Sequence, residues 1–178
     1  MWALEMVGNA ELRRALDEAT SLVVVQQYRD EIERLRGMFG HSITVLADDD
    51  VSGAPRPTCY AFAFGLTGNP RYQQLLMERR DRALTPLNSG LVQRFLSTNE
   101  LLPRIGPPEP DDVVLYSDNG NVRHGGIVMP LERMFRSKWG PAEVHEHAMW
   151  EVPRSYGETA VIYHAPDPIR ILTLIEQG

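Results

Sequence analysis

The chain lacks the marks of several common classes of protein. Its 178 residues include a single cysteine, Cys59. One cysteine excludes an intramolecular disulfide and a zinc site built from several thiolates. The chain has 18 lysines and arginines against 24 aspartates and glutamates, a net charge of -6, and no run of basic residues forms a stripe. We therefore expect neither a nucleic acid nor an anionic membrane surface as a partner.

Long hydrophobic runs and targeting signals are also lacking. The longest apolar run near the N-terminus, residues 22–25, is far too short to cross a bilayer. The first residues have no basic region followed by an apolar core and a small-residue cleavage site, so they do not resemble a signal peptide. By default we expect a cytoplasmic protein, and export without a cleaved signal stays open.

Composition and length indicate a globular fold. Hydrophobic residues make up 43% of the chain, which is enough for a core of ordinary size. The length fits one compact unit, in which we expect an N-terminal helical extension over residues 1–50 and a main domain over residues 51–178.

Hydrophobic periodicity divides the chain into a helical first part and a strand-rich second part. Helical spacing predicts helices over 9–19, 21–38, within 67–82 and over 89–97, with a short strand at 42–47. Alternating patterns predict strands over 112–116, 123–129, 132–138, 143–147 and 159–164, with a hairpin turn at Asn119-Gly120. This order predicts an α+β fold, in which N-terminal helices pack on a C-terminal antiparallel sheet.

The single cysteine lies where a helix is expected to begin. Pro57 and Thr58 precede Cys59, and Gly65 ends the apolar run that follows. A thiol in the first helical turn faces free N–H groups and the positive end of the helix dipole, which lower its pKa. A small buried hydrophobic residue is the other interpretation of Cys59.

Among the five histidines, His124 is the best candidate for a base that serves this thiol. It precedes Gly125 and Gly126 at the start of a predicted strand, where absent side chains leave room for a substrate backbone. A surface histidine beside a glycine turn is the alternative. Nucleophilic catalysis by a thiol requires such a base within hydrogen-bond reach, and a further group that orients the base.

A second pair of histidines lies later in the chain. On a strand, Glu143, His145 and His147 share one face. One of these histidines would orient His124, or two histidines and a carboxylate would bind a divalent metal with open positions. A solvated edge strand explains the pattern equally well, and these alternatives stay open at the level of sequence.

Three segments in order resemble the papain-like cysteine peptidases of the NlpC type. They are residues 57–63 (PTCYAFA), 108–116 (PEPDDVVLY) and 124–128 (HGGIV), where the family has a Pro-Gly-Asp approach to an apolar strand and then His-x-Gly-Ile. The similarity covers roughly residues 55–165. Residues 137–140 and 156–157 and His147 are similar to a poorly characterised bacterial branch of that superfamily.

Two departures bear on the substrate. Asp111 stands where the family usually has glycine, and Tyr60-Ala61 replaces the Ser-Gly that often follows the nucleophile in cell-wall peptidases. Both differences argue against peptidoglycan.

The resemblance implies a papain-like fold and a cysteine-dependent hydrolase or acyl-transfer enzyme, such as a peptidase, amidase or deamidase, in the role of a bacterial effector or toxin. Cys59 would be the nucleophile and His124 its base, with His147 as the third residue and His145 as its substitute. The substrate would be a protein or a peptide-like amide, and no cofactor or metal is expected.

Two other functions remain from the sequence. One is a non-enzymatic protein-interaction module on a degenerate papain-like fold, which would contact a protein partner through the N-terminal helices. The other is a metal-dependent protein that uses His124, His145 and His147 as ligands.

Overall fold

A single antiparallel sheet organises the computed structural model, which describes residues 10–22, 24–46, 58–78, 86–131, 134–139 and 143–177. Within these ranges the strand order is β1-β5-β4-β3-β2-β6, and every neighbouring pair is antiparallel. The strands are β1 (Thr44–Leu46), β2 (Val113–Asp118), β3 (Asn121–Val128), β4 (Met134–Trp139), β5 (Glu143–Ala148) and β6 (Thr159–Tyr163).

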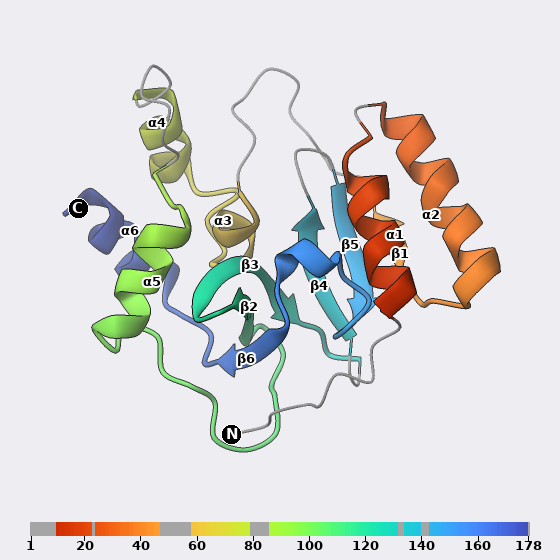
Figure 1. The fold of residues 1–178 in the computed structure, drawn as a ribbon. Coiled ribbons are helices and arrows are strands. Elements are labelled where there is room, and N and C mark those ends of the chain that lie inside the picture. The colour runs from red at the N-terminus through yellow and green to blue at the C-terminus, as the bar shows by residue number, and fades with distance from the viewer. Residues whose placement is uncertain are drawn as a thin grey trace.

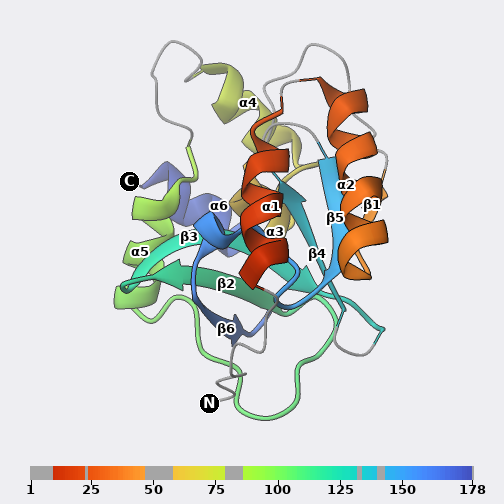
Figure 2. The same cartoon turned by 45° about the vertical axis from the view of Figure 1, so that its right-hand side comes forward.

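Helices lie on both sides of this sheet. They are α1 (Ala10–Thr20), α2 (Val25–Phe39), α3 (Cys59–Ala63), α4 (Pro70–Glu78), α5 (Ser89–Ser97) and α6 (Pro168–Glu176), with a short 3-10 turn η1 (Arg154–Tyr156) before β6. Figures 1 and 2 show α1 and α2 on one side of the molecule and α4, α5 and α6 on the other. The α+β class predicted from the sequence is therefore confirmed.

The alternation of side chains along β2 separates two cores. Val113 and Leu115 belong to a core with buried residues of α3, α4, α5 and α6, which we call the apolar face. Val114 and Tyr116 point the other way, into a core with buried residues of α1 and α2, which we call the ring face. Because successive side chains of a strand point to opposite sides, one sheet contributes to both cores.

The predicted helical extension contributes to the same sheet as the rest of the chain. The apolar stripes of α1 and α2 pack on the ring face through residues such as Leu16 and Ile32. After α2 ends at Gly40, which has a left-handed φ of 67°, β1 pairs with β5. The boundary expected at residue 50 lies outside the described residues.

The helix at the C-terminal end of the described chain was not predicted from the sequence. The Asp167 side chain accepts a hydrogen bond from the Ile169 N–H, and Pro168 occupies the first helical position. Both are ordinary helix-start signals. Ile171 and Ile175 then pack into the apolar face. None of the described helices is long and apolar enough to cross a membrane.

Candidate active site

The predicted helix start at Cys59 is confirmed. Thr58 is the N-cap of α3, and its side-chain oxygen accepts a hydrogen bond from the Ala61 N–H at 3.2 Å. Gly65, with a φ of 68°, follows the short helix. Cys59 therefore lies in the first turn, where the backbone N–H groups are not used within the helix.

The environment of the Cys59 thiol differs from the expected one. The residue is half-buried and packs against the apolar face. Burial raises the pKa of the thiol from 9.0 to about 11, and the nearby N–H groups of Gly125, Tyr60 and Cys59 itself offset only part of this rise. The expectation of a lowered pKa was therefore wrong, because desolvation outweighs the helix N-terminus. At neutral pH the thiol keeps its proton.

Gly125 brings β3 close to α3. A methyl group built at this glycine would meet side-chain carbons of Leu115, Tyr60 and Ala63 at 3.2, 3.4 and 3.5 Å. The space left by the absent side chain is thus filled by α3 and its neighbours. The expectation that this glycine leaves room for a substrate backbone was wrong for this reason.

A β-bulge lies immediately before His124, and the regular alternation of β3 after the bulge places His124 on the ring face. Tyr116 pairs with His124 and Ser117 pairs with Val122, so Arg123 is an extra residue in β3. Val122 belongs to the apolar face, and Gly125 faces α3 on that same side. His124 instead lies opposite Tyr116 and joins the ring face.

The His124 imidazole is enclosed by other rings. Only 2% of the residue is exposed, and its ring stacks on Tyr156 with 3.9 Å between centroids and 15° between planes. Burial, followed by the neighbouring His147 and His145, lowers the pKa of His124 well below 6.5. The ring is therefore neutral at pH 7, and its buried Nε2 has no hydrogen-bond partner.

Cys59 and His124 are neighbours in the fold but not a bonded pair. Among the hydrogen bonds of the described residues, none joins the Cys59 Sγ to the His124 ring. The sulfur instead interacts with the backbone N–H of Gly125, one residue along the strand. The structure thus brings the helix start and the histidine strand together without closing the predicted dyad.

His147 takes part in a closed hydrogen-bond network. The Trp139 Nε1–H donates to Ser137 Oγ at 2.8 Å, and the Ser137 hydroxyl donates to His147 Nε2 at 2.8 Å. The other nitrogen, Nδ1, donates to the Ala148 carbonyl at 2.9 Å. Both ring nitrogens are thus occupied. The structure places His147 close to His124 but does not join them by a hydrogen bond.

His145 anchors α2 to the sheet. Its Nε2 accepts a hydrogen bond from the Tyr28 hydroxyl at 2.5 Å, while Nδ1 donates to the Glu143 carbonyl at 3.1 Å. The Trp139 ring stacks on the imidazole with centroids 4.2 Å apart. Nearby, Arg29 of α2 pairs with the buried Glu143 carboxylate at 2.5 Å. His145 therefore joins a helix to a strand in the interior.

Two of the alternatives for this histidine pair do not fit the structure. β5 lies between β1 and β4, and His145 and His147 are both 0% exposed, so a solvated edge strand is wrong. Within the described ranges no group of three histidine, cysteine or acidic residues could hold a metal ion. The ring nitrogens of His145 and His147 that a metal would need are used by Tyr28, Ser137 and backbone carbonyls.

Asp111 keeps the backbone conformation that favours glycine. Its φ is 69°, in the left-handed region that residues other than glycine seldom adopt. The next residue, Asp112, is buried, and its carboxylate accepts hydrogen bonds from Arg104 Nε at 2.7 Å and from the Glu109 N–H at 2.8 Å. The Asp112 carboxylate thus holds the turn that leads into β2.

Two residues near the site, Arg13 and Tyr156, could not be assigned a role from their sequence context. Arg13 precedes no recognisable motif, and only its place one residue after an apolar position of α1 marks it. Tyr156 contacts His124 through a non-local approach of η1 to the sheet. No spacing in the sequence encodes that contact.

Comparisons with known proteins give no relative: no protein-family model, no curated protein and no solved structure matches this chain.

Proposed function

We propose that the protein is a cysteine-dependent hydrolase or acyl-transfer enzyme on a papain-like fold, with Cys59 as nucleophile and His124 as general base. The observation that carries this proposal is the position of the Cys59 sulfur. It lies in the first turn of α3 beside the N–H of Gly125, and His124 is the adjacent residue of that strand. The glycine-like backbone at Asp111 supports the resemblance on which the proposed family rests.

The electrostatics favour a neutral pair over a thiolate-imidazolium pair. The pKa of the thiol is raised and that of His124 is lowered, so both groups are uncharged at neutral pH. His124 then takes the thiol proton as the sulfur forms its bond to the acyl carbon, which is general-base catalysis. N–H groups at the first turn of α3 stabilise the oxyanion.

The second half of the reaction follows from the first. The imidazolium returns its proton to the leaving group as the carbon–nitrogen bond breaks, and an acyl group stays on Cys59. Water attacks this thioester, and His124 takes one proton from the water. The carbon–sulfur bond then breaks as the imidazolium returns this proton to the sulfur, which gives a carboxylic acid and the free thiol. An amine acceptor in place of water gives transfer.

This mechanism requires movement at the site. The Cys59 Sγ and the His124 ring lie on opposite faces of β3, so a rearrangement of this strand must bring them within hydrogen-bond distance when substrate binds. A peptide-like amide is the substrate class that the resemblance supports.

Acyl-enzyme trapping tests the proposal. The protein is incubated with p-nitrophenyl esters whose acyl groups range from acetyl to blocked amino acids, and the modified residue is mapped by mass spectrometry. We expect an acyl group on Cys59, and a rate at least about 100-fold lower in His124→Gln. His164, an exposed histidine after β6, gives the matched control His164→Gln. Equal rates in the wild type and His124→Gln, or no acylation of Cys59 by any ester, would contradict the proposal.

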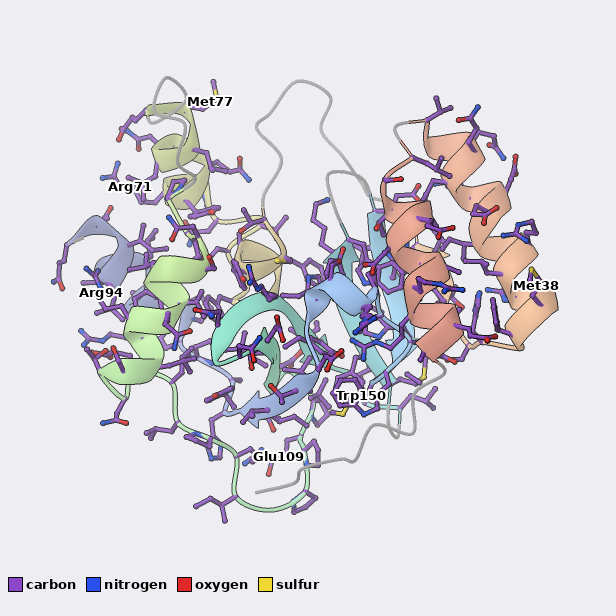
Figure 3. The ribbon with its side chains drawn as sticks, in the orientation of Figure 1. Met38, Arg71, Met77, Arg94, Glu109 and Trp150 are labelled. Carbon is purple, nitrogen blue, oxygen red and sulfur yellow. The ribbon has the colours of Figure 1, made fainter. Side chains whose placement is uncertain are left out.

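A non-catalytic interaction module is the second candidate, favoured by the protonated thiol and by the unpartnered Nε2 of His124, which is not bonded to that thiol. The inner faces of α1 and α2 pack on the sheet, so a partner would meet their outer surfaces. There Met38, at the end of α2, points away from the sheet (Figure 3). Recovery of one stoichiometric partner that is unaffected by Cys59→Ala would favour this function, and loss of binding in Cys59→Ala would count against it.

A further inference from the structure

An arginine of α1 clamps both ends of η1. Arg13 is only 4% exposed, and its Nε donates to the Val152 carbonyl at 3.2 Å while Nη2 donates to the Gly157 carbonyl at 2.5 Å. The same guanidinium lies 5.3 Å from the centre of the Trp150 ring, which is near the lower end of α1 in Figure 3. A planar guanidinium suits such a two-point contact, because its donors have a fixed geometry.

Two further contacts fix the same turn. Asp17, one helical turn after Arg13, accepts hydrogen bonds from the N–H and the hydroxyl of Ser155 at 3.0 and 2.6 Å. On the other side, Gly157 lies against β2 with a φ of 127°, and a methyl group there would meet the Ser117 carbonyl oxygen at 2.5 Å. η1 is thus fixed against both α1 and the sheet.

The side chain that this fixed turn presents to the sheet is Tyr156. Its ring stacks on His124, and it meets the Trp139 ring edge-on with centroids 6.2 Å apart. The 15° angle between the two planes shows that the imidazole lies flat against the tyrosine ring, which sets the plane of its nitrogens. The place of the proposed base therefore depends on a residue that lies far from it in the sequence.

We propose that Tyr156 is a positioning residue for His124 and that Arg13 of α1 holds Tyr156 in that place. This inference rests on the proposed function, in which His124 takes a proton from Cys59. When the imidazole becomes an imidazolium, the face of the tyrosine ring attracts the new positive charge, because aromatic faces carry negative potential. The tyrosine ring thus stacks on the neutral imidazole and also stabilises the charged imidazolium.

Two substitutions at Tyr156 separate the ring from the hydroxyl. Tyr156→Phe keeps the stacked ring, whereas Tyr156→Leu keeps bulk and removes the aromatic face. The first measurement is the NMR signal of the His124 ring C–H groups, assigned through His124→Gln and followed with pH. We expect a shift of these signals in Tyr156→Leu as the ring current is lost, and rescue of the wild-type position in Tyr156→Phe.

The second measurement is the rate of Cys59 acylation by the same esters. We expect Tyr156→Leu to slow it by about 10- to 100-fold, since a small displacement of a catalytic group costs rate on this scale. Tyr156→Phe should recover most of that loss. Equal loss in both variants would overturn the inference, because the hydroxyl rather than the ring would then be needed.

Arg13→Lys tests the clamp, with the exposed neighbour Arg14→Lys as its matched control. Lysine keeps the charge but not the two-point geometry, so we expect the His124 signals to shift in Arg13→Lys and to stay in Arg14→Lys. If Tyr156→Leu does not fold, this pair decides alone: unchanged His124 signals in folded Arg13→Lys would overturn the inference. The NMR result stands even if Cys59 never becomes acylated, so failure of the positioning role and failure of the proposed reaction are distinguishable.

Discussion

The two faces of the sheet are built from different chemistry, although the same strands supply both. The apolar face packs Leu, Ile, Val, Phe and Tyr side chains of α3, α4, α5 and α6, and it also holds the Cys59 thiol. The ring face buries three histidines, joined to tyrosine, tryptophan and serine by hydrogen bonds and stacks. One face is stabilised by removal of apolar surface from water, and the other also depends on satisfied polar groups.

This difference between the two faces explains why Cys59 and His124 are not joined by a hydrogen bond. Gly125 and His124 are adjacent in β3, yet one faces the helix that carries Cys59 and the other faces the ring cluster. Each environment keeps its ionisable group neutral through burial. The proposed reaction therefore joins groups from opposite faces of one strand.

Acid should distinguish the two faces most strongly. The pKa of His145 is lowered to about 3 and that of His147 to about 4, mainly by burial, and His124 shifts in the same direction. Between pH 6.5 and about 4 the unfolded chain binds protons that the folded chain does not. Stability is thus lost as pH falls, by about 1.4 kcal/mol per pH unit for each such histidine.

Urea unfolding at successive pH values measures this dependence. His145→Gln should make it less steep, while His164→Gln, at an exposed position, should not. A wild-type free energy of unfolding that stays constant between pH 6.5 and 4.5 would show that the buried histidines do not act in this way.

Truncation of a side chain in the apolar face should lower the free energy of unfolding by nearly as much as acid does. This loss should not depend on pH. Phe95 of α5 is 1% exposed and packs in this core. Phe95→Ala is expected to lower the free energy of unfolding by about 3–5 kcal/mol, because it removes buried area and leaves a cavity. Urea unfolding at neutral and acidic pH should give the same loss. A loss that changes strongly with pH would mean that the two faces are coupled.

Removal of one hydroxyl from the ring face should have a smaller effect. Ser137→Ala leaves the Trp139 Nε1–H and the His147 Nε2 without their shared partner, and we expect a loss of about 1–3 kcal/mol. Ser117→Ala is the control, since Ser117 bonds to Thr159 at an exposed position. Its cost should stay below about 0.5 kcal/mol. An equal loss of unfolding free energy in Ser137→Ala and Ser117→Ala would show that the buried network is no more stabilising than an exposed hydrogen bond.

Much of the fold follows from local patterns. The period of apolar residues located α1, α2 and α5, and Thr58 marked the start of α3, because these signals act within a few residues. The missed helix α6 had a usable signal in Asp167-Pro168. The alternation of apolar and polar residues also located the strands, although the predicted boundaries differ by a few residues from the observed ones.

The arrangement of the site was much less predictable. The extra residue Arg123 in β3 puts Val122 on the same face as Gly125 and opposite His124, and nothing in the run Arg123-His124-Gly125 signals this bulge. β1 pairs outside β5 and buries His145 and His147, through a contact between distant parts of the chain. The prediction of a lowered thiol pKa was wrong because it rested on the helix end alone. The packing around the sulfur, which raises the pKa, depends on non-local contacts.

The ionisation of Cys59 in the folded protein tests the neutral-pair account most directly. Iodoacetamide labelling is followed from about pH 6 to pH 11 in native protein, in urea-unfolded protein and in His124→Gln. Because the pKa of the thiol rises from 9.0 to about 11 on folding, labelling near pH 8 should be about 100-fold slower in the native state. His124→Gln should leave the native profile unchanged. Native labelling that is faster than unfolded labelling at pH 7, and that slows in His124→Gln, would contradict the account by showing a preformed thiolate-imidazolium pair.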